Sequence, residues 1–173
     1  MKRVALLCLL LVTVFSFTVL PNCACCCVEA FFVSPSVDGV IESEIIKALD
    51  EAEKSIYIAM YSFTDDQLAD AIIRAYDRGV KVRILLDDGQ DSDKGNRQFP
   101  KLIDAGIAVR VEHVTGLLHH KFAVIDERLV ITGSYNWSDN ADDNNFENVV
   151  FISCKEIAEV YVKKFKEIWN MLE

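Results

Sequence analysis

The chain has 173 residues, with 27 acidic and 18 basic side chains, and a formal net charge of −9. This length predicts one folded domain behind an N-terminal extension. Proteins that bind long polyanions tightly are usually basic, so the net charge argues against tight, processive binding of long duplexes. It fits weak contact with nucleic acid through a few local cations, and it also fits another substrate.

The N-terminal extension is typical of an export signal. Lys2 and Arg3 precede an apolar run at 4–20, as in a secretory signal peptide. We expect cleavage after Ala30, with Ala24 as the second choice, and a periplasmic or extracellular domain at 31–173. The alternative is a retained membrane anchor formed by residues 4–20, which approach the length of a membrane span.

The cysteine content of the domain depends on that cleavage. Five of the six cysteines lie in the extension, so cleavage after Ala30 leaves Cys154 as a single buried thiol in a disulfide-free domain. If the extension is retained, the Cys23–Cys27 cluster is open to acylation or cross-linking. The domain has no pair of cysteines spaced to bind a metal.

Strands and helices alternate along the domain until a hairpin interrupts the pattern. The alternation predicts an α/β fold in which a mixed β-sheet is sandwiched by helices. The acidic stretches 87–93 and 139–145 are expected to be loops, and the first lacks the ligand spacing of a calcium loop. Thr64 is expected to cap the second helix. The predicted strands are 31–33, 55–63, 80–86, 107–112, 122–125, 129–132 and 147–153, and the predicted helices are 42–54, 65–77, 96–105 and 156–172.

The predicted hairpin brings together four polar side chains that are suited to catalysis. Its two apolar runs are separated by the polar stretch 126–128. If the turn has two or four residues, Lys121 faces Ser134 and His119 faces Asn136. Opposed side chains have Cβ atoms about 5 Å apart, so an imidazole, an ammonium, a hydroxyl and a carboxamide would form one patch.

Such a patch suits the chemistry of a phosphodiester. Lys121, Ser134 and Asn136 would bind the non-bridging oxygens as phosphorus becomes five-coordinate. A neutral nitrogen of His119 would attack phosphorus and form a phosphohistidine, and Glu147 would fix the tautomer of the ring. This chemistry needs neither a metal nor another cofactor.

The spacing of these residues resembles a known signature. The pattern His119-x-Lys121-x4-Asp126-x6-Gly133-Ser134-x-Asn136 resembles the HKD motif of the phospholipase D superfamily, and the chain resembles its secreted endonucleases with a single motif. The resemblance implies a phospholipase D-like fold and a catalytic set of His119, Lys121, Asp126 and Glu147. Because Asp126 lies at the hairpin turn, we expect its role to be structural.

The remaining basic residues are expected to have minor roles. His120 points to the opposite face of its strand and is expected to pack or to support the site, and His113 is expected in a loop. Additional local cations would come from Arg128, and from Lys94 and Arg97.

A single motif also predicts an oligomer. The mechanism implied by the resemblance needs two histidines, one to attack phosphorus and one to protonate the leaving oxygen. A symmetric homodimer with both copies of His119 at its axis supplies them. We therefore expect a nonspecific endonuclease acting on DNA or RNA. The alternatives are a phospholipase D or phosphatidyl transferase acting on phospholipid headgroups, and a non-catalytic nucleic-acid or scaffold protein that retains the fold.

Overall fold

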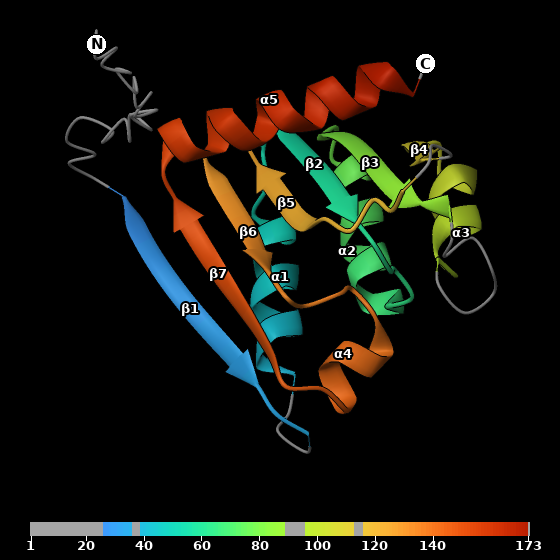
Figure 1. Ribbon diagram of the computed structural model, residues 1–173. Helices are drawn as coiled ribbons and strands as arrows, with labels where there is room; N and C mark the ends of the chain where they lie inside the picture. The colour runs from blue at the N-terminus through green and yellow to red at the C-terminus, as the bar shows by residue number, and fades with distance from the viewer. Residues whose placement is uncertain (1–25, 36–38, 89–95, 113–115, 173) are drawn as a thin grey trace, which may run out of the picture.

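The computed structural model describes residues 26–35, 39–88, 96–112 and 116–172. This part of the chain forms one seven-stranded mixed sheet in the order β1-β7-β6-β5-β2-β3-β4, with helices on both faces (Figure 1). The predicted α/β sandwich is confirmed. The strands are β1 (Cys27–Val33), β2 (Ser55–Met60), β3 (Lys81–Asp87), β4 (Ala108–Glu112), β5 (Lys121–Ile125), β6 (Leu129–Gly133) and β7 (Glu147–Ser153), and the helices are α1 (Val40–Asp50), α2 (Asp66–Asp77), α3 (Phe99–Asp104), α4 (Asp139–Asp143) and α5 (Lys155–Met171).

The sheet has a parallel half and an antiparallel half. Strands β2, β3 and β4 run parallel, because a helix returns the chain between each of them. Strands β5, β6 and β7 follow one another antiparallel, and β5 pairs antiparallel with β2. The β5–β6 hairpin therefore lies in the middle of the sheet, where both halves hold it.

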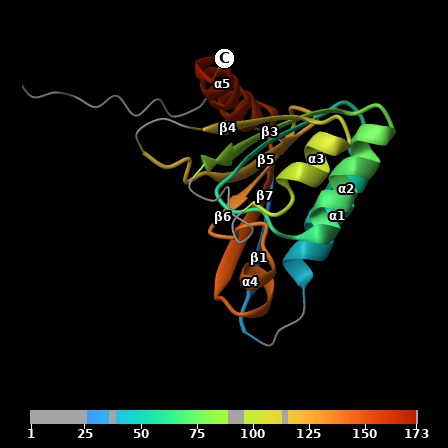
Figure 2. The same cartoon turned by 90° about the vertical axis from the view of Figure 1, so that its right-hand side faces the viewer.

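Each face of the sheet buries its own hydrophobic core. Helices α1, α2 and α3 cover one face, where Ile45 and Ile72 pack against alternate residues of the strands. Helix α5 covers the other face, where Phe165 contacts the ring of Tyr57. Figure 2 shows the three helices on one side of the sheet and α5 on the other. Strand β2 is buried along its whole length, as its apolar run predicts.

Two local predictions are corrected by the structure. The N-cap of α2 is Asp65, whose side chain accepts a hydrogen bond from the backbone N–H of Leu68, and not Thr64. The stretch 139–145 contains the short helix α4 and is not entirely loop. In the other acidic stretch, Asp87 ends β3, and residues 89–93 lie outside the described part of the chain.

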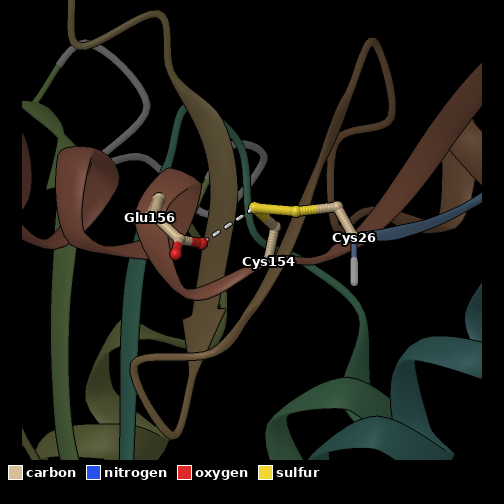
Figure 3. The surroundings of a disulfide bond; sticks show 3 residues. All are labelled: Cys26, Cys154 and Glu156. Carbon is tan, nitrogen blue, oxygen red and sulfur yellow. Dashed lines mark hydrogen bonds between the residues drawn. A yellow bond between two sulfur atoms is a disulfide. The ribbon is translucent and has the colours of Figure 1, made fainter. Parts of the chain in front are cut away.

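Strand β1 begins four residues before its predicted start. Residues 27–33 pair antiparallel with β7 over their whole length, and Cys26 forms a disulfide with Cys154 (Figure 3). Cys154 is therefore bonded and not free in the uncleaved chain. The disulfide-free domain was expected only after cleavage behind Ala30, which would remove Cys26, so that expectation stays a prediction. Cleavage after Ala30 would divide β1, whereas cleavage after Ala24 would leave the strand and the disulfide intact.

The apolar run at 4–20, predicted as part of a signal peptide with a membrane anchor as the alternative, lies outside the described residues. Within the residues that are described, no helix is long and apolar enough to cross a membrane.

Candidate active site

The β5–β6 hairpin has a different register from the predicted one. Phe122 pairs with Thr132 and Ile125 pairs with Leu129, so three residues form the turn in place of two or four. Asp126 and Glu127 adopt left-handed backbone conformations, with φ of 54° and 52°. The odd number of turn residues shifts the pairing by one position, so the predicted pairs Lys121–Ser134 and His119–Asn136 do not form.

The imidazole of His119 nevertheless lies beside the ammonium of Lys121. The Nζ atom of Lys121 is 3.3 Å from Nε2 of His119. A protonated lysine can only donate, so in this contact Nε2 accepts and carries a lone pair. Burial lowers the pKa of Lys121, and the nearby carboxylate of Glu147 opposes this by favouring the charged form.

An aromatic residue that the sequence analysis missed supports this pair. The ring of Tyr61 makes an edge contact with His119, with 4.6 Å between centroids, and Lys121 Nζ lies 5.1 Å from the centre of the same ring. Tyr61 directly follows β2, and its backbone N–H donates to the carbonyl of His120. Pairing of β2 with β5 therefore places the ring, and no sequence signal indicated that pairing.

Glu147 and Ser134 form a second group at the start of β7. Ser134 Oγ donates to Oε2 of Glu147, and Asn145 Nδ2 donates to Oε1 at 3.0 Å. Ser134 Oγ also accepts from the backbone N–H of Asn148. Among the described residues, no hydrogen bond joins Glu147 to His119, so the role of Glu147 in fixing the tautomer stays a prediction.

The glycine of the motif is explained by close packing of two strands. A Cβ atom at Gly133 would lie 2.0 Å from the carbonyl oxygen of Asn148, where no side chain fits.

The segment that follows β6 is bonded to the segment that follows β2. The backbone N–H groups of Thr64 and Asp65 donate to the carbonyl of Trp137. Asn136 lies in the same segment, and its buried Oδ1 has no hydrogen-bond partner among the described residues.

Asp126 lies at the far end of β5 from Lys121. At the strand rise per residue, five positions correspond to about 16 Å. Its carboxylate accepts hydrogen bonds from the backbone N–H groups of Glu53, Lys54 and Ser55. These contacts favour the structural role that we expected for Asp126, and the catalytic role implied by the resemblance stays a prediction.

The other predicted cations have partners of their own, lie at the hairpin turn or fall outside the described residues. Arg97 donates to the carbonyl of Thr64 and pairs with Asp66 and Asp139. Arg128 is exposed beside the hairpin turn, at the end that holds Asp126. His113 and Lys94 belong to segments that the structure does not describe.

A buried carboxylate fixes the segment that enters the motif. Asp87, at the end of β3, is fully buried, and its Oδ2 accepts a 2.6 Å hydrogen bond from the backbone N–H of Leu118. Leu118 directly precedes His119, so this bond positions the start of the motif. Asp87 was predicted from the sequence only as part of an acidic loop, because its contact with Leu118 joins positions 31 apart.

A compact group of possible metal ligands lies elsewhere in the fold. Within the described residues, the only such group consists of Cys26, Cys154 and Glu156, and its two sulfur atoms are joined in the disulfide (Figure 3).

Comparison with known proteins gives a consistent picture. Residues 45–169 match the family described as "Cardiolipin synthase, PLD-like domain". The mitochondrial cardiolipin hydrolase of Homo sapiens is 37% identical over 128 residues, which are 74% of this chain and 50% of that protein. A phospholipase D of Rickettsia conorii is 41% identical over 121 residues, which are 70% of this chain and 60% of that protein. The chain thus spans about half to three-fifths of these relatives.

Solved structures extend the comparison to the fold. The phospholipase D family member Nuc from Salmonella typhimurium superimposes with a TM-score of 0.78 and 28% identity, over 84% of this chain and 95% of that one. NucT from Helicobacter pylori gives a TM-score of 0.73 at 24% identity, over 84% and 96% of the two chains, and this likeness supports the fold alone.

Proposed function

The chain belongs to the phospholipase D-like family, and we propose that it is a phosphodiesterase that uses His119 as its nucleophile. The observation that carries this proposal is the 3.3 Å contact between His119 Nε2 and Lys121 Nζ. It joins a basic nitrogen to a positive charge, which are the two groups that displacement at a phosphate anion requires.

The reaction follows from these two groups. Nε2 of His119 attacks phosphorus while Lys121 neutralises a non-bridging oxygen. Asn136 supplies a further donor, and Ser134 supplies another when its hydroxyl turns from Glu147 to the phosphate. The bond from phosphorus to the leaving oxygen breaks, and that oxygen takes a proton from a second imidazole. Water then attacks the phosphohistidine, gives its proton to the second imidazole and frees His119.

The second imidazole is best supplied by another copy of the chain. The sequence holds one His-x-Lys motif, so an active homodimer would place both copies of His119 on one phosphodiester. Equal mixing of wild-type protein with His119→Asn protein tests this. Random exchange would leave about a quarter of the wild-type activity if both histidines serve one site, and about half if each subunit acts alone.

Nucleic acid is the leading substrate class, and phospholipid is the second. The single motif resembles that of secreted endonucleases and favours nonspecific cleavage of DNA or RNA. The names of the curated relatives refer to cardiolipin and to phospholipase D, which favours a lipid headgroup. The net charge of −9 is compatible with either class, because it predicts contact with the substrate through local cations alone.

We also propose that the domain works after export. The apolar run at 4–20 supports this, and so does the disulfide between Cys26 and Cys154, because disulfides persist mainly in oxidising compartments. N-terminal sequencing of the exported protein tests the boundary. A start at Cys25 agrees with the pairing of β1, and a start at Phe31 would contradict it.

Turnover assays separate the substrate classes. The protein is incubated in excess chelator with plasmid, single-stranded DNA, RNA and cardiolipin vesicles, beside the His119→Asn variant. We expect nucleic-acid cleavage by the wild type alone, with equal melting temperatures for the two proteins. If cardiolipin alone is hydrolysed, the substrate class is phospholipid and not nucleic acid. If no phosphodiester is cleaved, or if His119→Asn stays active, the proposed function fails.

A further inference from the structure

A cavity of about 430 Å³ lies beside His119, between the β5–β6 hairpin and α5. Its volume is that of a site for a small ligand or for part of a larger substrate. The mechanism above uses only one end of it. The lining residues are His119, His120, Lys121 and Phe122 from the β5 side, Thr132 and Gly133 from β6, and Val160, Tyr161 and Lys164 from α5.

The charge of this cavity differs from that of the chain. Its described lining contains two lysines and two histidines and no carboxylate, whereas the whole chain carries −9. Lys164 is about half exposed and pairs with Glu167 at 2.7 Å, one helical turn away. An ammonium has three donors, so this surface pair leaves Lys164 able to bind a second oxygen anion.

Aromatic contacts join His120 to the helix that carries Lys164. The ring of His120 makes an edge contact with Phe122 at 5.5 Å between centroids, and Phe122 contacts Tyr161 in the same way at 5.1 Å. These three rings connect β5 to α5 along the cavity wall. Burial lowers the pKa of His120, and the charges of Lys164 and Lys121 lower it further, so the neutral ring can donate one N–H.

Two cations from separate elements therefore border one cavity. Lys121 begins β5 beside the nucleophile, and Lys164 lies on α5. In the mechanism above, Lys121 is the only cation that neutralises the reacting phosphodiester. The second cation, with the N–H of His120, matches a second phosphate held a few bonds from the first.

We propose that Lys164 and His120 form a subsite for the phosphate next to the one that reacts. The proposal rests on the proposed function and names the substrate class more closely, as a molecule with two neighbouring phosphodiesters. A nucleic-acid strand and cardiolipin both have this chemistry. An acidic protein would in this way bind a polyanion through two local charges.

The test compares substrates that differ by one phosphodiester. The thymidine dinucleotide TpT has one and TpTpT has two, and phosphatidylglycerol has one and cardiolipin has two. For Lys164→Ala, we expect KM to rise about tenfold on the two-phosphate member of the pair that is cleaved, with kcat within about twofold. KM on the one-phosphate member should not change, and the pair that responds identifies the source of the second phosphate.

Two further variants control for charge and for folding. Lys164→Arg retains a cation and should restore most of the binding. Lys163→Ala removes the same charge from the neighbouring position, which borders a different surface cavity beside Glu127, and should leave both KM values unchanged.

Each remaining outcome decides against the subsite. For Lys164→Ala, an equal change of KM on both members of a pair, or no change on either, overturns the subsite. The proposed function still holds in that case, because the wild type cleaves the substrate. An equal effect of Lys163→Ala overturns the subsite as well, because the general charge of α5 would then explain the result. Failure of the wild type to cleave all four substrates would remove the proposed function and the subsite together.

Discussion

Oδ1 of Asp126 accepts a 2.7 Å hydrogen bond from the backbone N–H of Lys54, so the acidic residue of the motif holds the chain where β2 begins. Asp126→Ala would leave three backbone donors without this acceptor. We expect the free energy of unfolding to fall by about 2–4 kcal/mol, with kcat of the folded protein within about twofold. Urea denaturation measures the free energy of unfolding, and turnover at a temperature where the variant is folded measures kcat. A hundredfold loss of kcat in the folded variant would instead show a catalytic role for Asp126.

Gly133 is expected to tolerate no side chain. Gly133→Ala places a Cβ 2.0 Å from the carbonyl oxygen of Asn148, so β6 and β7 must separate near Ser134 and Glu147. We expect a loss of stability of about 2 kcal/mol or more and a fall in kcat. Thermal unfolding and turnover check this, with Thr132→Ser as a control on the same strand. Wild-type stability for Gly133→Ala would contradict the close approach of these strands.

The bond between Asp87 and Leu118 predicts a positioning role for Asp87. In Asp87→Ala, the buried N–H of Leu118 loses its acceptor, at a cost of about 1–3 kcal/mol, and His119 loses a fixed neighbour. We expect kcat to fall by about tenfold or more with KM little changed, whereas Asp87→Asn retains an acceptor and most of the activity. Steady-state kinetics of both variants make the comparison. A change confined to stability would show that Asp87 supports the fold alone.

His120 should make stability depend on pH. Burial and the charges of Lys164, Lys121 and His119 hold its pKa below the ordinary value of 6.5. The unfolded chain therefore takes up a proton more readily, so the free energy of unfolding falls as pH drops from above 6.5 through the folded pKa. His120→Gln should reduce this fall. Urea denaturation at pH 8 and at pH 5 measures it, and an NMR titration in which His120 has an ordinary pKa would disprove the cause.

The disulfide between Cys26 and Cys154 closes a long loop, since its cysteines are 128 positions apart. A loop of this length corresponds to a stabilisation of about 4–5 kcal/mol in the chain-entropy description. We expect reductant to lower the free energy of unfolding of the wild type by a large part of that value. The double variant Cys26→Ser, Cys154→Ser should not respond to reductant, and Cys27→Ser should behave as the wild type. An equal response in all three would exclude this pairing.

Periodicity in the sequence predicted the elements of the fold better than their contacts. Strand β7 and helix α5 were predicted within one residue of their bounds, because long apolar patterns define them. The hairpin register was wrong because Asp126 and Glu127 adopt left-handed conformations without the glycine or asparagine that usually marks them. A change of one residue in the turn shifts the register by one position and turns each side chain of the strand to the other face. The predicted pair Lys121–Ser134 therefore does not form.

Sequence spacing predicted the contact between His119 and Lys121, and it marked Ser134, Asn136 and Glu147 without their contacts. His119 and Lys121 share one short segment, and their spacing was sufficient to identify them. Tyr61, Asp87 and Lys164 reach the site through strand pairing and helix packing, which a single sequence does not show. The first four residues of β1 were assigned to the signal peptide for another reason, because a composition typical of such a peptide continues into them.

Among the described strands, β1 is the first to leave the ribosome, and β7, its only neighbour among them, is made last. During synthesis, β1 therefore stays without this partner until β7 has emerged. We expect folding to be completed after translation and to be slow for a protein of this size, since its outermost pairing joins residues more than a hundred positions apart. An exported chain would meet this condition naturally, because it crosses the membrane unfolded and forms the sheet on the far side.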